Sequence, residues 1–175
     1  MFGKSGRVVM SLNDLVPYLG APRGFSGSDV WREIESGTGP LPDDYKEFVA
    51  AYGPGAIGEF LYVFHPLERE QTMLDTIRDM APLYQELSPG QIPYGVYPEA
   101  LDGIIQWAST QEGDACFLVP ATSTTAWRVG VWFRQWAQWD EFEMSVTTWL
   151  GRQLSGDLRV AGLPLADRGG FSPSD

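Results

Sequence analysis

The stretch GIIQWASTQEGDACFLV, residues 103–119, contains two strand-like apolar runs on either side of a short polar segment. Both runs carry the apolar, β-branched and aromatic side chains that favour strands. The polar segment between them, Gln111-Glu112-Gly113, is typical of a hairpin turn. This stretch therefore predicts two antiparallel strands that pair directly.

More strand patterns lie on both sides of this hairpin. EFLYVF, residues 59–64, precedes it, and WDEFEM, residues 139–144, follows it as a short strand candidate. AWRVGVWFR, residues 126–134, alternates between two faces. One face carries Trp127, Val129, Val131 and Phe133, and the other carries Arg128, Trp132 and Arg134. We expect the first face to belong to the core and Trp132 to lie on a less buried face.

Helical patterns flank the strands. The clearest is LPDDYKEFVAAYG, residues 41–53, in which Tyr45, Phe48, Val49 and Tyr52 keep the spacing of one helix face. Its Pro42 is expected in the first turn, and Gly53 is expected just beyond the last one. The other helices are expected over Leu12–Leu19, over residues 29–36 after Ser28 as N-cap, over Arg69–Met80 before Pro82, and between Ser145 as N-cap and Gly156.

The order of these elements predicts the fold class. Helices come first, a strand meander follows, and one helix closes the pattern, which favours α+β with an antiparallel sheet and helices packed on it. A chain of 175 residues is expected to form one domain. Residues 1–27 are expected as an N-terminal extension with a short helix, residues 28–156 as the domain, and residues 157–175 as a loosely held tail.

The charge of the chain limits its partners. The formal net charge is −11 and the isoelectric point is about 4.4. Such a chain repels nucleic acid and anionic membranes and is attracted to basic partners, although solubility alone also explains the charge. No run of 18 apolar residues is present, so no membrane span is expected. A single cysteine excludes an internal disulfide and fits a reducing cytoplasm.

The residues that usually carry catalysis are scarce. The one histidine, His65, lies in a turn-like VFHPLE context, and the one cysteine, Cys116, lies inside an apolar strand run. One histidine and one cysteine cannot build a usual zinc site, and no complete calcium or phosphate-binding loop is present. A solvated charged face explains adjacent carboxylates such as Asp43 and Asp44. We therefore expect no catalytic residue, no cofactor and no metal.

Several stretches together resemble the SUKH superfamily, bacterial immunity proteins related to a fungal cell-wall-synthesis regulator. The similarity is carried by VWREIESGTGPLPDDYKEFVAAYGPGAIGEFLYVFHP at 30–66, by GIIQWASTQEGDACFLV at 103–119, by AWRVGVWFR at 126–134 and by EMSVTTWLGRQLSG at 143–156. It covers roughly residues 28–156. Residues 1–27 and 157–175 are departures from the family pattern.

The resemblance implies an α+β fold with a curved antiparallel sheet and no enzymatic activity. It also implies a cytoplasmic protein that binds and neutralises a bacterial toxin domain, often a nuclease. Two alternatives remain at this stage. One is a regulatory interaction module with the same fold, and the other is a small hydrolase that uses His65.

Aromatic residues beside carboxylates suggest where a basic partner would bind. The expected surface consists of Trp132, Trp136, Trp139, Asp140, Glu141 and Glu143. Trp136 and Trp139 are expected in a turn, with the alternative that both fold back over the hairpin. A second acidic surface is expected around residues 42–52, with Asp43, Asp44, Glu47 and Glu59.

Overall fold

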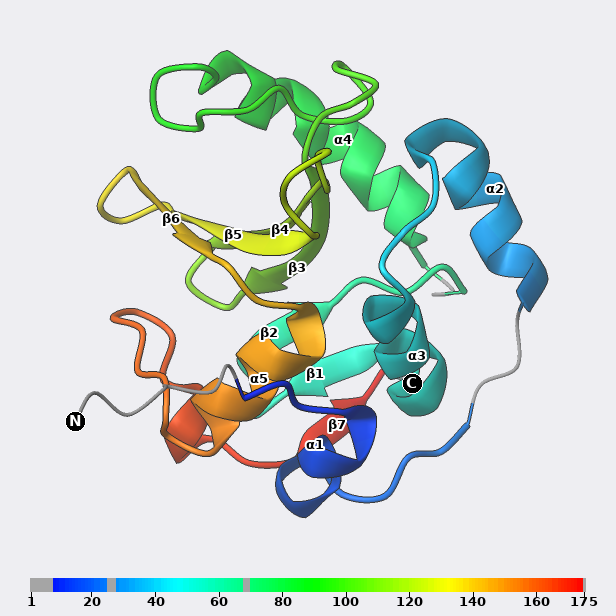
Figure 1. Ribbon diagram of the computed structural model, residues 1–175, viewed down its shortest axis with the longest axis vertical. Coiled ribbons are helices and arrows are strands. Elements are labelled where there is room, and N and C mark those ends of the chain that lie inside the picture. Colours follow the sequence, from blue (N-terminus) through cyan, green and yellow to red (C-terminus); the bar gives the residue numbers. More distant parts are fainter. Residues whose placement is uncertain (1–7, 25–27, 68–69, 175) are drawn as a thin grey trace.

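The computed structural model of the chain describes residues 8–24, 28–67 and 70–174. Its helices are α1 (Leu12–Leu19), α2 (Ser28–Thr38), α3 (Asp43–Tyr52), α4 (Met73–Glu86), α5 (Val146–Leu154) and the short 3-10 helix η1 (Leu165–Asp167) (Figure 1). Its strands are β1 (Gly55–Ile57), β2 (Leu61–Val63), β3 (Ile105–Thr110), β4 (Ala115–Val119), β5 (Arg128–Phe133), β6 (Gln138–Phe142) and β7 (Phe171–Pro173).

All seven strands form one antiparallel sheet in the order β6-β5-β4-β3-β2-β1-β7. The sheet is open, so β6 and β7 are its two edges. The predicted hairpin is confirmed, because β3 and β4 pair from Ile105 with Leu118 to Ser109 with Ala115. Gly113 closes their turn at φ +86°, a conformation that favours glycine. The α+β class predicted from the sequence is therefore confirmed.

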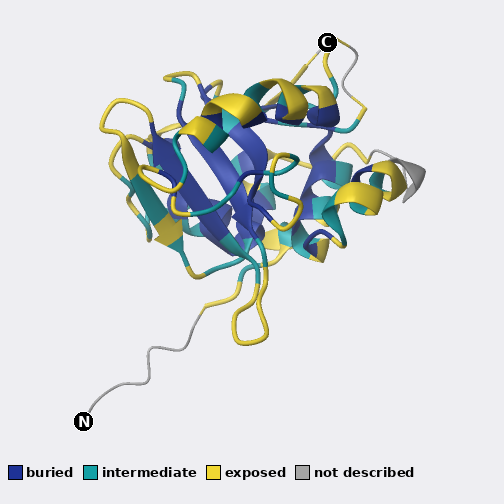
Figure 2. Cartoon of the chain, turned by 90° about the horizontal axis from the view of Figure 1, so that it is seen from above, coloured by how far each residue is buried: buried dark blue, intermediate teal, exposed yellow. Residues whose placement is uncertain are grey.

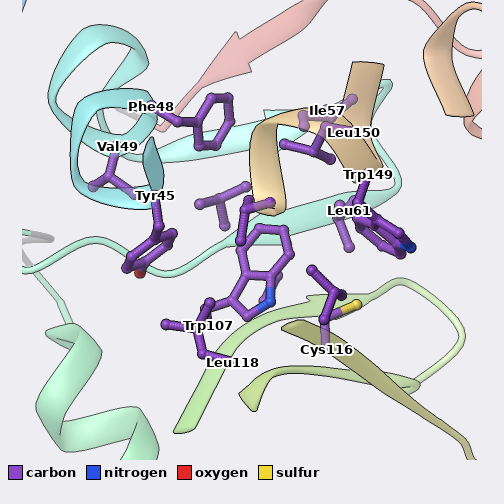
Figure 3. Packing of buried hydrophobic residues seen from close by; sticks show 14 of the residues in the cluster. Tyr45, Phe48, Val49, Ile57, Leu61, Trp107, Cys116, Leu118, Trp149 and Leu150 are labelled. Carbon is purple, nitrogen blue, oxygen red and sulfur yellow. The ribbon is translucent and has the colours of Figure 1, made fainter. Parts of the chain in front are cut away.

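The main core lies between the sheet and helices α1, α2, α3 and α5. Trp107 is fully buried at its centre, where the register between β3 and β4 shifts at a bulge (Figure 3). Its ring contacts Tyr45 of α3 at 5.9 Å and Trp149 of α5 at 6.0 Å between centroids. Trp107 shares the face of Ile105, two residues earlier, which is the face that these helices cover, so one residue of the sheet contacts both α3 and α5.

A second core lies on the opposite face of the sheet. Phe117 and Trp132 of the sheet pack there against Tyr84 of α4, with Ile92 and Val96 from the segment that follows α4. Strands β4 and β5 are thus buried on both faces, as the dark blue centre of Figure 2 shows. The alternation predicted for residues 126–134 is present, but its second face is not open to solvent.

Helix α4 joins the two cores and is longer than predicted. It begins at Met73 and runs through Pro82 to Glu86, whereas the sequence pattern predicted an end before Pro82. A proline inside a helix costs roughly 3 kcal/mol or more. Ala81, just before the proline, and Tyr84, two residues after it, are both buried, and their burial offsets that cost. Arg69, the predicted start, lies outside the described residues, but residues 70–72 are not helical and Thr72 is the N-cap, so the predicted start was too early.

Three other boundaries differ from the prediction. Ser28 is the first residue of α2 instead of its N-cap, and Pro42 is the N-cap of α3 instead of a residue of its first turn. The predicted strand at 59–64 is shorter, and an additional strand, β1, precedes it. Turn chemistry explains the last difference, since Gly58 at φ +58° and Glu59 at φ +54° connect β1 to β2.

As far as the structure describes them, the segments before α2 and after α5 belong to the fold. Leu15 of α1 is fully buried, and a side chain at Gly151 of α5 would overlap Met10 and Leu15, so α1 lies close against α5. The expectation of a loose tail after residue 156 was wrong. Leu165 is buried, and β7 pairs with β1 from Gly55–Pro173 to Ile57–Phe171. Glycines and prolines in this segment mark tight turns around buried leucines.

We expect Phe48→Ala to lower the free energy of unfolding by about 3–5 kcal/mol, because it removes a fully buried ring from the main core. Glu47→Ala is the matched control, since Glu47 is the exposed neighbour on the same helix and should change stability by less than about 0.5 kcal/mol. Urea denaturation of both variants measures the difference. Equal stabilities would contradict the place of Phe48 in the core.

We expect Leu165→Ala to lower the free energy of unfolding by about 2–5 kcal/mol, because Leu165 is buried in the main core. Arg159→Ala, at an exposed position of the same C-terminal segment, is the control. Thermal and urea unfolding provide the measurement. A Leu165→Ala protein as stable as the control would mean that the segment after α5 contributes nothing to the core.

Candidate functional site

The predicted binding residues gather around the β5–β6 hairpin at one edge of the sheet. β6 pairs with β5 from Val129 with Phe142 to Phe133 with Gln138, and residues 134–137 form the turn. Because side chains alternate along a strand, Trp139 and Glu141 share the face of the second core. Asp140 and Phe142 lie on the face of the main core. Ala137 closes the turn at φ +50°.

Trp132 does not belong to a binding surface. Its side chain is 8% exposed and packs in the second core, with its ring 6.0 Å from that of Tyr84. The prediction failed because α4 and the segment after it cover this face of β5. The alternation of residues along a strand does not show whether another segment, distant in sequence, covers one of its faces.

Trp139 lies in β6 and not in a turn, and it folds back onto the sheet. Its half-buried ring lies 5.7 Å from the ring of Phe117 and 5.8 Å from that of Tyr94. Gly130, on the neighbouring strand, leaves the room for it, because a Cβ there would lie 2.2 Å from the indole. Trp139 therefore serves packing and offers a partner only part of its surface.

Trp136 is different, because 49% of it is exposed. It lies in the β5–β6 turn with its ring 5.5 Å from Phe133, and a side chain at Gly162 would overlap it. The indole is thus supported from beneath while its outer side faces solvent. A large aromatic side chain held in this way loses little conformational freedom when a partner covers it.

Glu141 is the centre of a hydrogen-bonded network. Arg128 Nε donates to its Oε1 at 2.6 Å, and Tyr94 Oη and Trp139 Nε1 donate to its Oε2 at 2.7 and 3.3 Å. Burial of the carboxyl opposes ionisation, but the bonds from Tyr94, Arg128 and Trp139 outweigh it and hold the pKa of Glu141 below its usual value. The network fastens the segment after α4 to β6.

The other two carboxylates of this edge lie outside this network. Asp140 is half-buried and accepts a hydrogen bond from the Gln138 amide at 2.7 Å, while Glu143 is exposed just beyond β6. Glu143 also borders an open groove of about 400 Å³, lined among others by Val9, Trp127 and Thr148. Together with Trp136 they form what we call the β6 edge: Trp136, Trp139, Asp140, Glu141 and Glu143.

The second predicted acidic surface is divided among different roles. Asp44 accepts the Thr147 backbone N–H at 2.9 Å and so caps the N-terminus of α5 from α3. Asp43 is exposed and lies 3.5 Å from Lys46. Glu47 is exposed on α3, and Glu59 is exposed in the β1–β2 turn. Asp44 is therefore a structural residue, and the others remain candidates.

The two residues considered for nucleophilic chemistry are buried. His65 is 3% exposed, its Nδ1 accepts the Leu67 backbone N–H at 3.0 Å, and burial lowers the pKa of its imidazole to about 4. Cys116 is fully buried in the main core, where burial raises the pKa of its thiol.

In the described part of the chain no group of three or more potential metal ligands gathers. None of its helices is long and apolar enough to cross a membrane.

Sequence reasoning missed Tyr94 and the partnership of Arg128 with Glu141. Arg128 stood in the alternating pattern, and hairpin pairing would place it near an acidic residue of the next strand. Tyr94 carries no comparable signal, because it lies in an irregular segment more than 30 residues away in sequence from Arg128.

Comparisons with family models, curated proteins and solved structures found no match.

We expect Glu141→Gln to lower the free energy of unfolding at pH 7 by about 1 kcal/mol, because it removes the charge that Arg128 and Tyr94 bind. The wild-type pKa is depressed, so this contribution is present above the usual glutamate pKa of about 4.3 and is lost as the pH falls through the folded value. The gap between the two proteins should therefore narrow from pH 6 to pH 3.

Urea denaturation at several pH values measures this gap, with Asp140→Asn on the same strand as the control. A gap that stays constant across this range would show that the charge of Glu141 does not stabilise the fold.

Proposed function

We propose that this chain is a non-enzymatic immunity protein that binds and neutralises a bacterial toxin domain in the cytoplasm. The observation that carries the proposal is the β6 edge, which carries the half-exposed Trp136 in the turn before the strand, Asp140 within it and Glu143 just beyond it. An aromatic anchor followed along the same edge by carboxylates suits a basic protein surface. The resemblance of residues 28–156 to the SUKH superfamily supports the choice of a toxin as partner.

The charge of the whole chain supports the same partner class. A net charge of −11 attracts a basic domain before contact and accelerates the encounter. Nuclease domains are basic where they grip phosphate, so a nuclease toxin would offer such a surface. The carboxylates at the β6 edge would then orient the encounter, and Trp136 would hold the complex together once formed.

We do not propose a hydrolase, because its only candidate histidine is buried. A regulatory interaction module would use the same surface. Only an immunity protein would also protect cells from the toxin domain. The toxin domain is expected from the gene immediately upstream, within a secreted multidomain protein. Protection of cells that express this domain is the decisive measurement, and binding without protection would favour the regulatory module.

We expect Trp136→Ala to weaken the complex by about 2 kcal/mol or more through faster dissociation, as the loss of an aromatic anchor does. Asp140→Lys with Glu143→Lys should instead slow association, with a smaller effect at high salt. Binding kinetics at two salt concentrations measure both effects. Trp139 and Glu141 are left unchanged, because changes there would disturb the packing of the second core and the ion pair with Arg128.

Melting temperatures of all variants confirm that they fold. If both variants bind and protect cells like the wild type, the β6 edge is not the binding surface. The exposed acidic residues Asp43, Glu47 and Glu59 then become the next surface to change.

A further inference from the structure

The β6 edge is also an unpaired edge of the sheet. β6 pairs with β5 on one side, and among the described residues no strand pairs with its other side (Figure 1). An edge strand presents a row of backbone N–H and C=O groups that can pair with another chain. The backbone of β6, and not only its side chains, is therefore available to a partner.

The other edge of the sheet is less suited to this role. β7 has three residues and ends at Pro173, which has no backbone N–H to donate. β6 has five residues, Gln138–Phe142, and contains neither proline nor glycine. Of the two edges, β6 thus offers the longer and less interrupted row of pairing groups.

The charges of β6 select which chain can pair with it. A second copy of β6 in antiparallel pairing about Asp140 would place two Asp140 carboxylates opposite each other, and like charges directly opposite are destabilising. An extended segment with lysine or arginine at alternate positions would instead meet Asp140 on one face. On the other face its apolar side chains would meet the outer side of Trp139, as cross-strand neighbours do.

We propose that β6 accepts an extended, cationic segment of the partner as an added strand of the sheet. This inference rests on the proposed function, since the segment would belong to the toxin domain. Backbone pairing supplies the affinity. The carboxylate of Asp140 supplies the selectivity, because it favours a strand with alternate cationic side chains over a neutral strand, an acidic strand or a second copy of β6. Trp136 lies in the turn just before this strand and would contact the end of the added segment.

The test uses the isotope-labelled full chain and a capped synthetic peptide in which lysine alternates with valine. Titration followed by amide chemical shifts should give saturable changes centred on Gln138–Phe142. The same peptide with glutamate in place of lysine should bind at least tenfold more weakly. Two further peptides carry N-methyl groups on the odd or on the even residues, and at least one should lose binding by tenfold or more, because methylation removes the pairing N–H groups.

Two protein variants with the same change in net charge separate local from general electrostatics. Asp140→Lys with Glu143→Lys should weaken the lysine peptide at least tenfold. Glu33→Lys with Asp79→Lys, at exposed positions of α2 and α4, should weaken it less than threefold. Equal losses in the two variants would overturn the proposal.

The proposal also fails if the shifts centre elsewhere, if both N-methylated peptides bind as well as the parent, or if the free chain forms a dimer through β6 in sedimentation. None of these measurements involves a toxin. A peptide that pairs with β6 while the chain gives cells no protection would therefore refute the proposed function and leave this inference standing. Protection without strand pairing would do the reverse.

Discussion

The fold depends on a chain of aromatic contacts that passes through Trp107. The rings run from Trp31 of α2 to Tyr45 of α3, then to Trp107 of β3 and Trp149 of α5, and end at Phe142 of β6, each 5.8–6.0 Å from the next. This series of aromatic contacts connects three helices to the centre and to the edge of the sheet. Trp107 lies on the face that the helices cover because it follows Ile105 by two residues, and side chains alternate between the faces of a strand.

The candidate surface is rigid for the same reason. Phe142 fixes one end of β6 to α5, while Glu141 joins it to Arg128 and Tyr94 through hydrogen bonds. Trp139 packs against Phe117 in the second core. The edge strand is thus held from both faces, and its unpaired side, preceded by Trp136 in the turn, forms a preformed surface. A preformed surface spends little entropy on binding.

The sequence predicted much of this arrangement from local patterns. The apolar spacing of Tyr45, Phe48 and Tyr52 indicated α3, and the turn at residues 111–113 indicated the β3–β4 hairpin. Both signals are local, since each depends on residues that lie close together in the sequence. The same holds for the aromatic-acidic run at 136–143, which indicated the β6 edge although it could not say which side chains face outward.

What the sequence alone determined is therefore the α+β class, the helices and strands with strong periodicity, and the acidic and aromatic character of residues 136–143. Tertiary structure alone decided that Trp132 is buried, that Glu141 is bound by Arg128 and Tyr94, and that the C-terminal segment adds β7 to the sheet. The physical reason is the same in each case. These residues owe their environment to segments far away in the chain, and periodicity within a segment carries no information about what covers it.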